Sequence, residues 1–206
     1  VNCEISKSTA FSLLVPSGTR CEPESRPGLA AVSLDMSQRG AGRRSSREIV
    51  EDLDFMGVER SSSISTIHTS FAVACIADAF YPTLEIYADI VQSPHLPPEE
   101  IDESQQTCLQ ELLAMEDDPS QKVFTELKTM RFGSEYGRSA FGTEEGITAV
   151  TMEQVQRYIE STYTPQETIL AVAGKFDWAE LCATVEKLFG RWQVKGTFPT
   201  KAVKPI

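Results

Sequence analysis

The stretch FGTEEGITAVTMEQVQRYIESTYTPQETILAVAGKFD, residues 141–177, holds the clearest structural signals in the chain. Thr151 stands three residues before Gln154, which is the spacing of a capping box, so a helix is expected to begin there. The apolar run ETILAVAGKF predicts a buried strand, and Asp177 directly after it is placed to cap another helix. We therefore expect helix, strand and helix in this order near the C-terminal end.

The sequence before this stretch alternates between strand and helix patterns. Period-two apolar runs predict one early strand and a hairpin, and apolar residues at helical spacing predict five helices. In chain order these are a strand at 9–18, helices at 27–38 and 45–57, hairpin strands at 58–65 and 67–76, helices at 80–94, 97–119 and 119–132, and a glycine-bearing surface loop at 136–147. The order favours an α+β fold, in which helices pack on one face of an antiparallel sheet.

Length and composition indicate one domain with a real core. The chain has 206 residues, of which 41% are hydrophobic. We predict a single domain over 1–192 and a basic, proline-bearing linker or tail over 193–206, leading toward a second domain not in this chain. The net charge of -11 argues against nucleic acid or an anionic membrane as the main partner. We expect a soluble chain without a visible signal peptide; the sequence does not indicate its compartment.

Four stretches, in order, resemble the insulinase, pitrilysin and mitochondrial processing peptidase family of zinc metallopeptidases. The resemblance covers nearly the whole chain and implies the LuxS/processing-peptidase-like metallohydrolase fold, with an antiparallel sheet and helices on one face. The four stretches are PSGTRCEPESRPGLA (16–30), SSREIVEDLDFMGVE (45–59), LQELLAMEDDP (109–119) and the stretch at 141–177.

The defining zinc motif of that family is degenerate in this chain. The family motif is His-x-x-Glu-His on a helix, where two histidines on one face bind zinc and the glutamate is the general base. In GLAAVSLDM, residues 28–36, the resemblance places Ala31 and Asp35 at the histidine positions and Leu34 at the glutamate. We therefore expect no catalytic residue and no zinc cofactor in this domain, whereas active relatives use zinc.

A distal glutamate of the family motif is retained as Glu111. Asp35 and Glu111 could share a cation, although two carboxylates suit calcium or magnesium better than catalytic zinc. The alternative is that both make only hydrogen bonds or ion pairs. The two histidines, His68 and His95, lie in different predicted elements; we interpret His68 as a structural residue of the hairpin and His95 as exposed.

These features give a leading hypothesis and two alternatives. The leading one is a catalytically inactive peptidase-like domain that forms a chamber wall and binds peptide as the non-catalytic partner of an active sister domain or subunit, in a homo- or heterodimer. The resemblance places the peptide-binding edge at Ser63, Ile64 and Ser65. The alternatives are an active peptide hydrolase with a displaced metal site built from His68, Asp35 and Glu111, and a purely structural assembly subunit.

Overall fold

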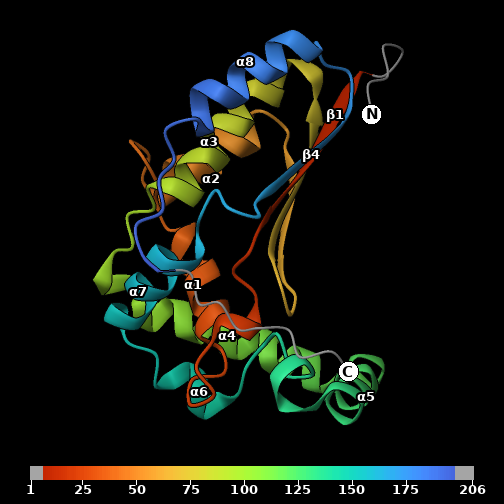
Figure 1. Cartoon of the computed structure of the whole chain (residues 1–206), viewed down its shortest axis with the longest axis vertical. Helices are drawn as coiled ribbons and strands as arrows, with labels where there is room; N and C mark the ends of the chain where they lie inside the picture. The colour runs from red at the N-terminus through yellow and green to blue at the C-terminus, as the bar shows by residue number, and fades with distance from the viewer. Residues whose placement is uncertain (1–6, 198–206) are drawn as a thin grey trace.

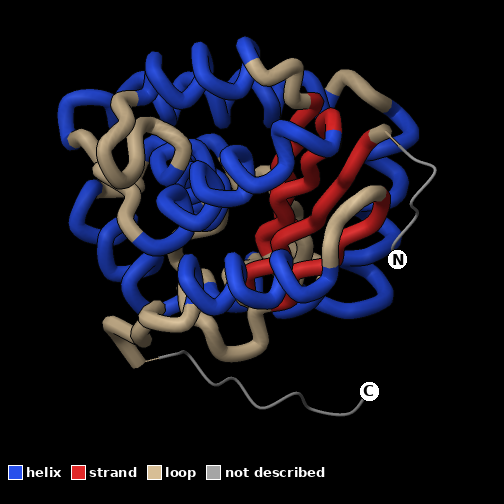
Figure 2. The backbone as a smooth tube through the Cα atoms, turned by 90° about the horizontal axis from the view of Figure 1, so that it is seen from above, coloured by secondary structure: helices blue, strands red, loops and turns tan. Residues whose placement is uncertain are grey.

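The computed structural model describes residues 7–197, so part of the predicted tail, 198–206, lies outside the described residues. Its centre is a four-stranded antiparallel sheet with the order β2-β3-β1-β4. Figure 2, seen from above, shows the strands as one twisted group beside a larger mass of helices. The strands are β1 Ser8–Val15, β2 Glu59–Ile64, β3 Thr69–Ile76 and β4 Ile169–Gly174.

Helices cover one face of this sheet, with α2, α3 and α8 stacked along its upper part and α1, α4, α6 and α7 gathered toward its lower end (Figure 1). The predicted α+β architecture is thereby confirmed. The α-helices are α1 Leu29–Ser37, α2 Ser46–Phe55, α3 Phe80–Gln92, α4 Ile101–Glu116, α5 Pro119–Tyr136, α6 Glu144–Thr148, α7 Met152–Thr162 and α8 Trp178–Phe189; short 3-10 turns lie at Thr19–Cys21, Ala77–Ala79 and Pro98–Glu100.

Strand alternation determines which side chains form the core. Phe11 pairs with Val73 and Leu13 pairs with Phe71 across β1 and β3, and all four side chains are buried on the helix side. Tyr87 of α3 packs edge-on against Phe11 and Phe71, with ring centroids 5.5 and 5.8 Å apart. The sheet and the helices therefore share one continuous apolar core.

The caps at Thr151 and Asp177 are found where the sequence predicts them, and α2 also begins with a capping box. Ser45 and Glu48 form a capping box at the start of α2, and Thr151 and Gln154 form another at the start of α7. The carboxylate of Asp177 accepts a hydrogen bond of 2.8 Å from the backbone N–H of Glu180 in α8. Each of these caps joins residues that are three positions apart in the chain, so such helix starts can be predicted from local sequence.

Residues 169–174 form a strand as predicted, but the prediction that this strand is buried was wrong. β4 is an edge strand of the sheet, and Ile169, Ala171 and Ala173 are exposed. Leu170 and Val172, which alternate with them, are partly buried on the helix side. A continuous apolar run therefore does not reveal that one strand face is open.

The surface loop predicted at 136–147 is found only in part. Residues 144–148 form the short helix α6, whose cap is the Thr143 hydroxyl, and Ile147 is fully buried. Gly146 lies directly against Pro27, and Gly142 lies against Gly28, so this segment is packed on the start of α1. No helix within residues 7–197 has the length and apolar character needed to cross a membrane.

Candidate functional site

A cleft of about 450 Å³ lies between α1, β2, α4 and the segment at 140–141. Ala31, Leu34 and Asp35 of α1 line it, and so does Glu111 of α4. The resemblance aligns the first three of these residues with the zinc motif of the family and Glu111 with its distal glutamate. The structure therefore brings together the residues that helical spacing and the resemblance group into one site.

A buried carboxylate fixes the start of α1. Glu22 Oε1 accepts hydrogen bonds from the backbone N–H groups of Gly28, at 3.1 Å, and Ala30, at 2.8 Å. Its other oxygen lies 3.8 Å from Arg138 Nη1. Burial raises the pKa of Glu22 to about 7, although the two backbone bonds and Arg138 act in the opposite direction. Glu22 thus holds in place the helix that carries the degenerate motif.

Asp35 forms an ion pair with Arg39. Arg39 lies four residues later in the chain, just after the end of α1, and its Nε is 2.6 Å from Asp35 Oδ2. The same guanidinium reaches Glu100 at 3.1 Å and Glu103 at 3.4 Å near the start of α4. One arginine therefore joins α1 to α4 through three carboxylates, with its planar group making contacts in two directions.

Glu111 is the free carboxylate of the cleft. Among the described residues it makes no hydrogen bond or ion pair. Partial burial raises its pKa, and the neighbouring negative charge of Asp35 raises it further. Cys108, buried one turn before Glu111, has a pKa of about 12 because burial and these two carboxylates disfavour the thiolate. The cleft therefore disfavours further negative charge.

The residues present do not fit the zinc ion of the family motif. A catalytic zinc site takes three protein ligands, with histidine nitrogen common among them. Here the helix supplies an alanine methyl group, a leucine side chain and a carboxylate already paired with Arg39. Among the side chains that the structure describes, those of His, Cys, Asp and Glu form no group of three or more that could hold a metal ion.

The edge strand β2 forms one wall of the cleft. Ser62, Ser63 and Ile64 line it, and of these Ser62 is not anticipated from the sequence. Ser65 lies outside the cleft lining, in the turn after β2, where its backbone N–H donates to the carbonyl of His68 at 2.8 Å and its hydroxyl accepts from the His68 N–H at 2.9 Å. The wall is thus formed by the end of β2, and Ser65 shapes the turn.

Neither histidine lies in the cleft. His68 is partly buried in the β2–β3 turn, where burial and the positive charge of Arg20 lower its pKa. His95 is exposed, and its Nε2 lies 2.8 Å from the carbonyl oxygen of Gly42. Asp35 and Glu111 therefore meet in the cleft without His68, the third residue of the displaced-site hypothesis.

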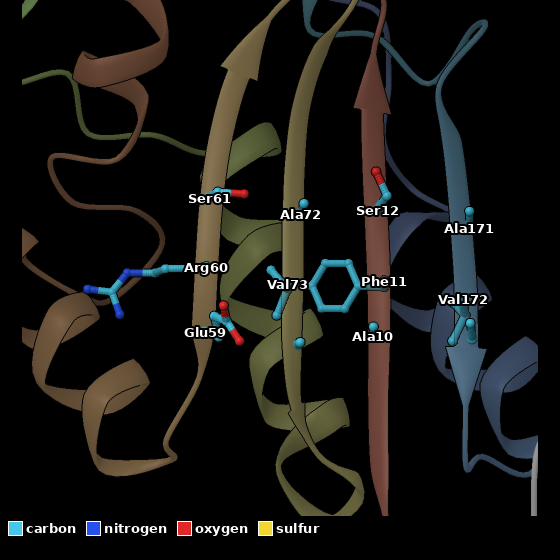
Figure 3. Close-up of a pocket in the computed structure, with 12 residues that line it drawn as sticks. Ala10, Phe11, Ser12, Glu59, Arg60, Ser61, Ala72, Val73, Ala171 and Val172 are labelled. Atoms are coloured by element: carbon cyan, nitrogen blue, oxygen red, sulfur yellow. The ribbon is translucent and has the colours of Figure 1, made fainter. Parts of the chain in front are cut away.

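A second hollow, of about 680 Å³, lies on the open face of the sheet. Figure 3 shows Ala10, Ser12, Ala72 and Ala171 side by side on this face, with helices behind the strands. Charged groups enter only from β2, and Arg60 there is paired with Asp54 at 2.8 Å. Small apolar side chains offer little chemistry, so the cleft beside α1 is the candidate functional site.

Comparison with known protein families shows to which family the chain belongs. The family model described as insulinase, peptidase family M16, matches residues 2–144, and the model described as peptidase M16 inactive domain matches residues 149–206. The chain belongs to the insulinase family, M16. The family suggested by the sequence is confirmed.

Curated relatives of this M16 domain include named subunits and zinc proteases. The β subunit of a probable mitochondrial-processing peptidase from Arabidopsis thaliana is 24% identical over 89% of this chain and 35% of its own length. Core protein I of the ubiquinol-cytochrome-c reductase complex from Euglena gracilis is 28% identical over 93% of this chain and 38% of its own. The zinc protease YmxG of Bacillus subtilis is 25% identical over 92% of this chain and 46% of its own length. The chain thus spans less than half of each of these relatives.

Solved structures show the same fold. Pitrilysin superposes with a TM-score of 0.86 at 18% identity, covering 100% of this chain and 23% of that one. A peptidase M16 inactive domain from Pseudomonas fluorescens superposes with a TM-score of 0.84 at 17% identity, and the match covers 100% of this chain and 50% of that one. The names of the zinc-protease relatives place zinc in active members of the family.

The sequence does not predict several of the residues that line the cleft of this M16 domain. Met115 lies one helical turn after Glu111 and Gln38 lies close to Asp35, so helical spacing alone could have identified both. Ala140 and Phe141 come from the segment that packs on the start of α1, far away in the chain. No local signal indicates that this segment closes the cleft.

Proposed function

We propose that this M16 domain is catalytically inactive and binds peptides as the non-catalytic partner of an active metallopeptidase domain. The observation that carries the proposal is the Arg39–Asp35 ion pair in the cleft, next to Ala31 and Leu34. Without a histidine pair to bind zinc and a glutamate to deprotonate its water, the site lacks the groups for metal-assisted hydrolysis.

The free edge of β2 supports peptide binding. β2 pairs with β3 alone among the described strands, so its other edge can accept an added strand. Ser62 and Ile64 lie opposite the buried residues Phe71 and Thr69, which places both on the helix side of the sheet. A peptide laid beside β2 would therefore direct alternate side chains toward the cleft.

A partner role is supported by the names of the relatives. Two of them are subunits of mitochondrial-processing peptidase and of the ubiquinol-cytochrome-c reductase complex, so related domains work within assemblies. We propose that the partner of this domain carries an intact His-x-x-Glu-His motif. The partner is then a sister subunit or another domain of a longer protein.

Mixing and binding measurements test the proposal. The purified chain should cleave no peptide alone, and cleavage should appear when a sister chain with the intact motif is added. Ser62→Glu should weaken peptide binding by at least about tenfold, because Ser62 lines the cleft and a larger, charged side chain there would fill space needed by the peptide and lose solvation when the peptide binds. Ser61→Glu, on the open face of the same strand, is the matched control and should leave binding unchanged. Equal loss of binding in both variants would contradict peptide addition at this wall.

A second candidate function is a purely structural assembly subunit. The Euglena core protein I favours it, because that relative is named as part of a respiratory complex. Under this reading the chain should associate tightly with its partner while binding no peptide, and Ser62→Glu should have no effect on either property.

A further inference from the structure

The cleft beside α1 holds one carboxylate that no cation of the described chain neutralises. Glu111 of α4 takes part in no hydrogen bond or ion pair among the described residues. Asp35, the other acidic residue of the lining, is already paired with Arg39 at 2.6 Å. None of the described residues that line the cleft is lysine, arginine or histidine. The cleft therefore presents a negative charge at Glu111 to whatever enters it.

Arg39 does not serve as the counter-charge of Glu111. Its guanidinium also lies 3.1 Å from Glu100 and 3.4 Å from Glu103, so one positive charge is shared by three carboxylates. Glu111 is not one of these three partners. Because the lining supplies no other basic side chain, a positive charge on a bound ligand is the natural partner of Glu111.

Apolar side chains beside this carboxylate indicate which kind of cation fits. Leu34, Met115 and Phe141 line the same cleft, and Leu34 and Met115 are each only 8% exposed. Lysine and arginine carry a long apolar stem that lies along such surfaces, with the charged group at its end. A calcium ion would instead need about six to eight oxygen ligands and would gain nothing from apolar walls. The lining therefore suits a basic side chain better than a metal ion.

We infer that the cleft is a subsite for one basic side chain, lysine or arginine, of a peptide bound along β2, and that Glu111 is the residue that selects it. The inference rests on the proposed peptide binding and adds its specificity. Ser62 and Ile64 lie on the helix side of β2 and line the cleft, so peptide residues opposite them direct their side chains to the same side. The peptide residues between them point to the open face. The subsite thus requires a basic residue at a cleft-facing position.

Calorimetry with paired peptides tests the inference. The probe is a short, end-blocked peptide of alternating threonine and valine, residues that favour an extended strand, with one valine replaced. Lysine replaces this valine in one version, and norleucine, which has an apolar chain without the charge, replaces it in the other. The purified chain should bind the lysine peptide about tenfold more tightly. A second pair compares arginine with its neutral analogue citrulline. A preference in either pair supports the subsite and identifies the side chain that it takes.

Two variants of the chain assign the preference to one residue. Glu111→Gln should abolish it while leaving the affinity for the norleucine peptide unchanged, because only the charge is lost. Glu116→Gln is the matched control, since Glu116 is exposed on the same helix and lies outside the cleft lining. This variant removes the same charge from the chain and should keep the preference of the wild type.

The possible failures separate this inference from the proposed function. Equal affinities of the charged and neutral peptides for the wild-type chain would overturn the subsite and leave peptide binding at β2 intact. Equal loss of the preference in Glu111→Gln and Glu116→Gln would also overturn it, because the preference would then reflect the overall charge of -11. If no version of the peptide binds, the proposed peptide binding fails, and the subsite fails with it.

Discussion

The Nε atom of Arg39 lies 2.6 Å from the carboxylate of Asp35, the residue that the resemblance aligns with the second histidine of the family motif. The same side chain continues to Glu100 and Glu103, so it ties the helix of the degenerate motif to α4. Asp35 thus contributes, through Arg39, to the contact between the end of α1 and the start of α4.

Removing the guanidinium should measure this structural role. Arg39→Met keeps much of the apolar stem but leaves Asp35 and Glu100 without their cation, so it should lower the free energy of unfolding by about 1–2 kcal/mol. Urea denaturation measures the change. Arg47→Met removes an equally short pair with Glu51 that is largely exposed, and it should cost less than about 0.5 kcal/mol. Equal effects would show that the Arg39 network adds no stability.

The buried carboxylate of Glu22 should make stability depend on pH. Its pKa rises from 4.5 to about 7 on folding, so its contribution to stability is present in full below pH 4.5 and is lost as the pH rises through 7. Between pH 5 and pH 8 the loss should reach about 2–3 kcal/mol. Glu22→Gln should flatten this part of the pH profile in urea denaturation. The exposed Glu24→Gln should leave the wild-type profile intact, and parallel profiles for all three proteins would refute the assignment.

The contact between Gly142 and the start of α1 should be sensitive to a single methyl group. A Cβ at Gly142 would lie 2.4 Å from the Gly28 Cα, and the backbone there has a φ of 77°. Gly142→Ala should therefore cost more than about 2 kcal/mol, from strain and collision together. Gly57→Ala has a similar φ of 64° but no atom within 4 Å, so it should cost only about 1 kcal/mol. Equal melting temperatures for the two variants would contradict the packing.

Restoring the motif should create a zinc site. Ala31→His, Leu34→Glu and Asp35→His together place two imidazoles on one helix face opposite Glu111, which is the ligand set of the family motif. The triple variant should bind one zinc per chain. Adding Glu111→Gln should then weaken zinc binding by at least about tenfold, since even outer partners of a metal site have effects of this size. A triple variant that binds no zinc would show that the cleft has lost the geometry as well as the ligands.

The sequence predicts those features of the fold that depend on neighbouring residues. The capping boxes at Ser45 and Thr151 are local, and so are the strand periodicities of β1 and β3. The burial of β4 depends on its place at the edge of the sheet, which strand composition does not reveal. Helix α6 was missed for a similar reason, because it is stabilised by packing of Gly146 on Pro27 across the molecule.

The residues of the candidate site likewise fall into those that can be predicted from local sequence and those that depend on the tertiary structure. Ala31, Leu34 and Asp35 follow from spacing on one helix, and the resemblance adds Glu111. The pairing of Arg39 with Glu100 and Glu103 could not be predicted, because it depends on how α1 and α4 cross. Phe141 was missed because its segment reaches the cleft only through its contact with the start of α1.

Metal content together with peptide cleavage by the purified chain tests the central claim most directly. Elemental analysis should find no stoichiometric zinc, and the chain alone should cleave no peptide, with or without a chelator. One zinc per chain, accompanied by cleavage that a chelator abolishes, would contradict the account.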